Sequence, residues 1–254
     1  LGSRGLGDVY KRQILFSPEE IYQMEDGHYR WVYMPKKQER ITESIQDFFV
    51  SPLGRAQATA APTLARLGRE AEVLPWLREF HGRVVNPKTG EPSIPWNLMP
   101  QYWTKQPELF SLDTWADEGL MRTGDAGEVY AQAACGLDEL LARYGFKRQG
   151  LIYACGQNTA DTIALFCHFA LGMALVSHLT GISPVLLWQG MFLPASSVTT
   201  FVSEERKKGE VVFRCMQLGD TSHLYAGGEG VSRAGLYDEV HEALPDEILQ
   251  STGR

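Results

Sequence analysis

An arginine follows a short apolar run in the segment FFVSPLGRAQATAAP, residues 48–62, at a point where a helix is expected to begin. Ser51 can cap that helix, Pro52 suits its first position, and the alanine-rich sequence to about residue 68 favours it. Arg55 in the first turn opposes the helix dipole by about 0.3–1 kcal/mol, and a bound anion would reverse that cost. Because the guanidinium fork suits phosphate oxygens, the segment predicts a phosphate site.

A histidine occupies a similar position later in the chain. Residues 162–167, TIALFC, form a near-continuous apolar run that is typical of a strand covered on both faces. His168 follows this run directly, and a helix is expected over 170–180, ending at Gly181. An imidazole there can donate a hydrogen bond to the same anion, or it can be a satisfied core histidine.

A carboxyl group completes the candidate chemistry in the segment WLREFHG, residues 76–82. Glu79 near a phosphate can protonate the leaving oxygen if its pKa is raised. His81 stands beside this candidate acid and is expected to line the substrate site. The alternative for Glu79 is an ordinary solvated charge, and for Arg55 a surface arginine.

Strands that alternate with helices must position these residues. Strands are expected at 45–50 and 162–167, and an apolar face at helical spacing predicts a helix over 129–144 that ends at Gly145. Two runs rich in β-branched residues on either side of a charged turn predict a hairpin within 197–217. We therefore expect an α/β fold of three layers, α/β/α, with a mostly parallel central sheet. Since ligands bind beyond the carboxyl ends of such strands, Arg55 and His168 should meet at one edge.

Two parts of the chain have a different character. The segment 83–126 is rich in proline and aromatic residues, which suggests a folded insertion that acts as a lid. Residues 1–13 suggest a disordered or foreign arm ahead of a domain over 14–254. A capping-box pattern at Ser17–Glu20 predicts a short helix, and residues 29–34 are typical of a strand.

Composition excludes several functional classes. The 254 residues carry a net charge of −7, which disfavours general binding to nucleic acid or to an anionic membrane. The four cysteines form no C-x-x-C pair, so we expect a cytoplasmic protein with no metal and no cofactor. Cys167 lacks the nearby arginine of a thiol phosphatase, and no Gly-x-Ser-x-Gly elbow occurs.

The motifs together resemble the histidine phosphatase superfamily, which includes the phosphoglycerate mutases. The likeness rests on SPLGRAQATA around Arg55, LREFHG around Glu79, IALFCHFALGMAL around His168 and GDTSHL at 219–224. These motifs appear in the family's order between about residues 45 and 224.

The resemblance implies a phosphomonoester hydrolase that acts through a phosphohistidine. Arg55 would bind the phosphate, His168 would be the second histidine and Glu79 the proton donor. The family's Arg-His-Gly motif, which carries the nucleophile on a first strand, is not found. The nearest sequence, DGHYR, has His28 before an apolar run rather than after one. We therefore expect that the first strand has been lost.

Two functions remain open besides such a phosphatase acting on a small-molecule phosphomonoester. One is a non-catalytic phosphate-binding or interaction protein on the same fold. The other is an unrelated hydrolase with an unrecognised nucleophile. The sequence fixes neither the substrate nor the oligomeric state.

Overall fold

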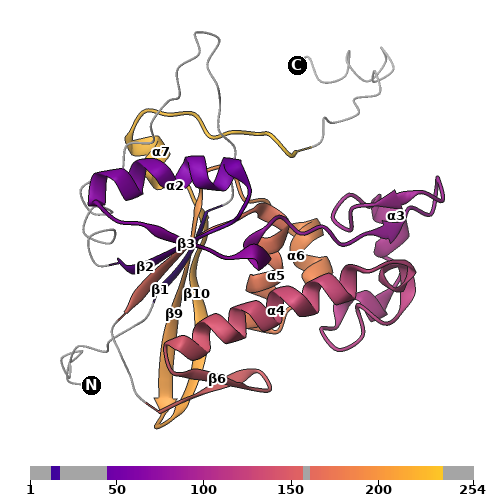
Figure 1. Ribbon diagram of the computed structural model, residues 1–254. Coiled ribbons are helices and arrows are strands. Elements are labelled where there is room, and N and C mark those ends of the chain that lie inside the picture. The colour runs from indigo at the N-terminus through magenta and orange to yellow at the C-terminus, as the bar shows by residue number, and fades with distance from the viewer. Residues whose placement is uncertain (1–12, 18–44, 157–160, 237–254) are drawn as a thin grey trace, which may run out of the picture.

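A central sheet organises the computed structural model, which describes residues 13–17, 45–156 and 161–236 (Figure 1). Within these residues the main sheet has eight strands in the order β3-β2-β8-β1-β9-β10-β7-β6, and β4 and β5 form a separate small ribbon. The strands are β1 Gln13–Ser17, β2 Ile45–Val50, β3 Ala71–Val73, β4 Val84–Val85, β5 Pro92–Ser93, β6 Phe146–Gln149, β7 Ile152–Cys155, β8 Thr162–Phe166, β9 Val198–Lys207 and β10 Glu210–Asp220.

The sheet is mixed. Strands β3, β2, β8 and β1 pair in parallel, whereas the pairs from β1–β9 through to β7–β6 are antiparallel. The α/β class is confirmed, and the parallel part is the half that carries the candidate site. The hairpin expected within 197–217 is β9–β10, and its turn uses Gly209 at φ 79°.

Helices cover both faces of the sheet, which confirms the three-layer architecture. Helices α2 and α7 lie on one face, and α4, α5 and α6 lie on the other (Figure 1). The helices are α2 Gly54–Leu67, α3 Pro100–Trp103, α4 Ala126–Arg143, α5 Phe169–Thr180, α6 Pro184–Gly190 and α7 Ser222–Ala226, and the 3₁₀ turns are η1 Pro75–Leu77, η2 Pro107–Phe110 and η3 Gly119–Thr123.

The expected helix ends are found, but one expected cap is wrong. Helix α4 ends before Gly145 and α5 ends at Gly181, and both glycines have a positive φ. Helix α2 begins at Gly54 after Leu53 and has no side-chain cap. Ser51 therefore does not cap α2, because its hydroxyl is engaged elsewhere, as described below.

The centre of the sheet is filled by β1, so the expectation that a first strand is missing is wrong. Its residues pair in parallel with β8, from Ile14 opposite Ile163 to Ser17 opposite Phe166, and antiparallel with β9. The five residues of β1 contain no Arg-His-Gly sequence. The helix expected from Ser17, the strand expected at 29–34 and His28 lie outside the described residues.

The segment 83–126 packs into the main core on the face of α4, α5 and α6. Trp115 is only 2% exposed and lies edge to face against Trp188 of α6, with ring centroids 5.8 Å apart. Ser183 donates a 2.6 Å hydrogen bond to the Leu109 carbonyl, and this bond ties the segment to α6. Burial of its aromatic residues therefore contributes to the core itself.

Candidate active site

The ends of β2 and β8 bring Ser51 and His168 to one edge of the sheet. Val50 pairs with Phe166, and the Ser51 N–H donates to the Phe166 carbonyl at 2.9 Å. The last three residues of β2 and most of β8 are apolar because helices cover the two faces of this part of the sheet. His168 follows β8 as the N-cap residue of α5, and it is 2% exposed.

The imidazole of His168 has a hydrogen-bond partner at each nitrogen. Nη2 of Arg55 lies 2.9 Å from Nδ1, and Oγ of Ser51 lies 2.7 Å from Nε2. A guanidinium can only donate, so Nδ1 must be the acceptor and Nε2 must carry the proton. The Ser51 oxygen therefore accepts from Nε2–H, and it also accepts from the Leu53 N–H at 3.2 Å. These contacts fix the tautomer of His168.

The charge state of His168 follows from its surroundings. Burial in the sheet edge and, second, the nearby positive charge of Arg55 lower its pKa from 6.5 to about 3. A buried ring beside a fixed cation loses free energy when it gains a proton. His168 is therefore neutral at pH 7.

Glu79 lies at the same site on the loop after η1. Its Oε1 accepts hydrogen bonds from the N–H of Phe80 at 2.8 Å and of Leu171, in the first turn of α5, at 3.1 Å. Burial raises the pKa of this carboxyl above 4.5, while the backbone bonds and the charge of Arg55 oppose that rise. The structure thus brings Arg55, His168 and Glu79 together around the N-terminal turn of α5.

Two residues differ from the sequence expectation. Ser51 is fully buried and contacts His168, although the sequence assigned it only to a helix cap. A serine directly after a buried strand was the available signal. His81 is exposed and lines a pocket beside the Glu79 loop. Within the described residues, no hydrogen bond joins His81 to Arg55, His168 or Glu79.

Three further observations apply to the part of the chain that the structure describes. No group of three His, Cys, Asp or Glu side chains lies close enough there to hold a metal ion. The Cys167 thiol is fully buried. None of the helices described is both long and apolar enough to cross a membrane.

Solved structures of phosphatases and hydrolases are similar to this chain at low identity. One is mycobacterial hydrolase 1, with 16% identity and a TM-score of 0.48, over 83% of this chain and 99% of that one. Another is a mycobacterial glucosyl-3-phosphoglycerate phosphatase, with 17% identity and a TM-score of 0.45, over 81% and 96%. A third is a phosphoserine phosphatase from Entamoeba histolytica in complex with 3-phosphoglyceric acid, with 16% identity and a TM-score of 0.46, over 84% and 98%.

No curated protein sequence matches this chain significantly. A family model does match, over residues 37–215, and its description is histidine phosphatase superfamily, branch 1. The matched stretch begins after β1 and includes Arg55, Glu79 and His168. Since it covers more than half of the sequence and all three residues of the candidate site, the chain belongs to the histidine phosphatase superfamily.

Proposed function

We propose that this protein binds the phosphate group of a small-molecule phosphomonoester beside the hydrogen-bonded pair of Arg55 and His168. The observation that carries the proposal is the convergence of Arg55, His168 and Glu79 at the ends of two parallel strands. Membership of the superfamily supports a phosphatase-type reaction on that ester.

Arg55 and His168 would act on the phosphoryl oxygens. The guanidinium supplies a fixed positive charge with several N–H donors, and such a group stabilises the charge of a transferring phosphoryl group. A bound phosphate dianion would also offset the effect of Arg55 on the imidazole. Phosphate binding should therefore raise the pKa of His168 and favour its protonated form.

Glu79 would be the proton donor. Burial keeps its carboxyl protonated to a higher pH than usual, as a general acid requires. Its two backbone hydrogen bonds orient the group toward the edge where Arg55 lies. When the ester P–O bond breaks, this proton would pass to the leaving oxygen.

A phosphohistidine route would need two steps. A histidine nitrogen forms a bond to phosphorus while the ester P–O bond breaks and Glu79 protonates the leaving alkoxide. Water then attacks phosphorus, the N–P bond breaks, and the Glu79 carboxylate takes the proton from the water. The first step requires a nucleophilic histidine directly beside Arg55.

A second function, phosphate binding without turnover, is favoured by the sequence of β1. That strand ends at Ser17, opposite Phe166, so its carboxyl end lies at the edge of Ser51 and His168. The residues next in sequence are Pro18, Glu19 and Glu20, so the sequence directly after the strand contains no histidine. We therefore propose that this chain turns over phosphomonoesters weakly at most.

The test compares two proteins on p-nitrophenyl phosphate and in titrations with inorganic phosphate. One is the full chain, and the other carries Ser17→Arg, Pro18→His and Glu19→Gly. We expect phosphate binding by the full chain, lost in Arg55→Ala, and a large gain of turnover in the triple variant. Arg206→Ala, which removes an exposed arginine of β9, is the matched control and should bind phosphate normally.

Three results would count against these assignments. Equal turnover by both proteins would refute the need for an installed histidine, and loss of that turnover in His28→Ala would assign the nucleophile to His28. Phosphate binding that survives Arg55→Ala unchanged would refute the proposed site itself. Turnover that survives Glu79→Gln without loss would remove Glu79 from its role.

A further inference from the structure

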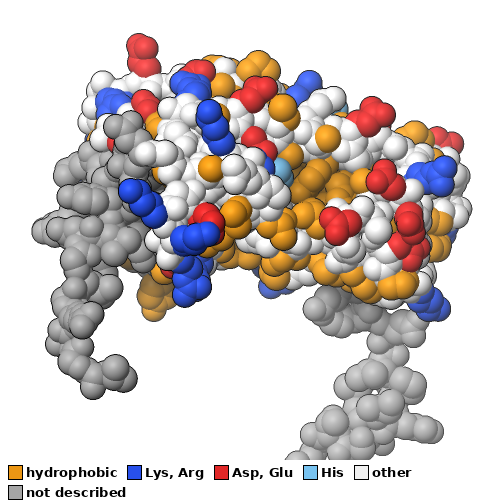
Figure 2. Space-filling view, turned by 90° about the horizontal axis from the view of Figure 1, so that it is seen from below, with side chains coloured by type: hydrophobic (Ala, Val, Ile, Leu, Met, Phe, Trp, Pro, Cys, Tyr) orange, Lys and Arg blue, Asp and Glu red, His pale blue; other side chains and the backbone are white. Residues whose placement is uncertain are grey.

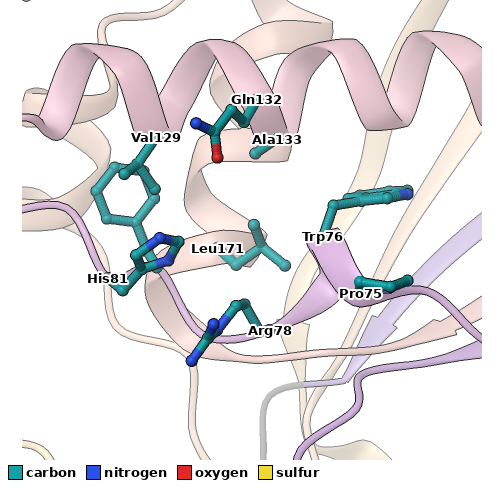
Figure 3. A pocket seen from close by; sticks show the side chains of 9 residues that line it. Pro75, Trp76, Arg78, His81, Val129, Gln132, Ala133 and Leu171 are labelled. Carbon is teal, nitrogen blue, oxygen red and sulfur yellow. The ribbon is translucent and has the colours of Figure 1, made fainter.

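A pocket of about 330 Å³ lies beside the Glu79 loop and is lined by other residues than those that meet at His168. It is formed between η1 with the loop that follows it, helix α4 and the first turn of α5 (Figure 3). Its floor is apolar, with Phe80, Val129, Ala133 and Leu171 all buried. This volume is at the lower end of the range for small-molecule sites, which suits a ligand of one or two rings.

The polar groups of the pocket favour an anion. Arg78 and His81 extend from the loop on one side, and Gln132 points toward them from α4 (Figure 3). None of the lining residues is acidic. The guanidinium of Arg78 takes part in no ion pair among the described residues, so it is available to the carboxylate of an organic anion. Guanidinium and carboxylate groups form strong, two-pronged hydrogen bonds.

An aromatic wall is built into the same pocket. The indole of Trp76 packs against α4 at Gly136, where an added Cβ would lie only 2.5 Å from the ring. The glycine therefore permits an approach that no other residue would allow. A flat indole beside buried aliphatic side chains offers a stacking surface for a planar, apolar ligand.

We propose that this pocket is a second ligand site, for a small organic anion with a flat apolar body. The anionic group binds Arg78 and His81, the body lies against Trp76, and Gln132 hydrogen-bonds the ligand from α4. The site adjoins Glu79 without including it: Phe80 and Leu171 line the pocket, and their N–H groups hold the Glu79 carboxyl. An occupant is therefore placed to shift the backbone that orients the candidate acid.

The test uses 2-naphthoate as the probe and the full chain labelled with ¹⁵N. The indole N–H signal of Trp76 is assigned by its loss in Trp76→Phe. We expect saturable movement of that signal with 2-naphthoate, and weak or no movement with the neutral 2-naphthalenemethanol. Inorganic phosphate should leave the Trp76 signal in place, because phosphate is expected to bind at Arg55 and His168. The 2-naphthoate titration therefore tests this pocket alone, and the phosphate titration tests the proposed function alone.

Two variants and one control examine the contacts. Arg78→Ala should weaken 2-naphthoate binding by about tenfold, the usual effect of removing a charge-assisted hydrogen bond. Ala133→Leu should fill the pocket with a larger side chain and prevent 2-naphthoate binding. The signals of the other indole N–H groups report whether this variant remains folded. Arg206→Ala, an exposed arginine on β9, should not change binding. Binding that is insensitive to Arg78→Ala, equal binding of the neutral probe, or an unmoved Trp76 signal would each overturn the proposal.

Discussion

Replacing His168 by asparagine should make the folded protein less sensitive to acid. In the folded state burial and Arg55 hold the pKa of His168 at about 3, whereas the unfolded chain has the ordinary value of 6.5. Between these two values the unfolded state binds a proton that the folded state does not. The free energy of unfolding should therefore fall as the pH is lowered from about 6.5 toward 3.

The size of this loss in the free energy of unfolding follows from the difference between the pH and the ordinary pKa of histidine. Each pH unit below 6.5 costs about 1.4 kcal/mol until the folded pKa is reached, so His168 alone costs about 2 kcal/mol at pH 5. In His168→Asn the side-chain oxygen can still accept from Arg55, and no proton is gained on unfolding. The variant should lack this part of the acid sensitivity, whatever its stability at pH 7.5.

Urea unfolding of both proteins at pH 7.5 and pH 5 measures the difference. Groups that titrate in both proteins, Glu79 among them, cancel in the comparison. Arg206→Ala removes an exposed arginine of β9 and is the control; this variant should show the same pH dependence as the parent protein. If His168→Asn loses as much stability between the two pH values as the parent does, His168 is not held neutral and the description of the site is incorrect.

Three further changes test other contacts. Ser51→Ala should cost about 1–3 kcal/mol in urea unfolding, because a buried imidazole N–H loses its acceptor, and an unchanged midpoint would contradict the assigned tautomer. Gly136→Ala should cost about 1–3 kcal/mol and move the Trp76 indole signal, whereas Gly54→Ala, which has open space, should do neither. Trp115→Ala should cost about 3–5 kcal/mol if the segment 83–126 is part of the core; loss of less than 1 kcal/mol would favour a detachable lid.

The strand ends of the candidate site were predictable from sequence because their signals are local. A buried parallel strand has a nearly continuous apolar run, and β8 shows one that continues through Cys167 to His168. In β2 the run is shorter, since only its last three residues are apolar before Ser51. Helix ends were predictable for the same reason, since Gly145 and Gly181 adopt the left-handed conformation that glycine favours. The sequence alone therefore predicted that Arg55 and His168 lie at the same edge of the sheet.

Contacts between distant segments were harder to predict. The pairing of Ser51 with His168 joins residues 117 apart in sequence, and no local pattern distinguishes it from a helix cap. The hairpin β6–β7 was not predicted, because each of its two strands has only four residues, too few for a clear periodic pattern. His81 was expected at the substrate because of its neighbour Glu79, and this role stays a prediction; the structure places His81 at a pocket beside the Glu79 loop.

The strand β1 shows that forming the fold of a family and carrying the side chains that its reaction requires are separate matters. A short strand is held in the sheet by backbone hydrogen bonds to β8 and β9, and almost any apolar sequence can form them. The phosphohistidine route proposed above needs, in addition, a nucleophilic histidine beside Arg55. The register opposite Phe166 puts the end of β1 at the edge of Arg55 and His168, so under that proposal a histidine introduced at this end would distinguish hydrolysis from simple binding. The triple variant at residues 17–19, which changes only the last residue of β1 and the two that follow it, is therefore the change that separates the two proposed functions.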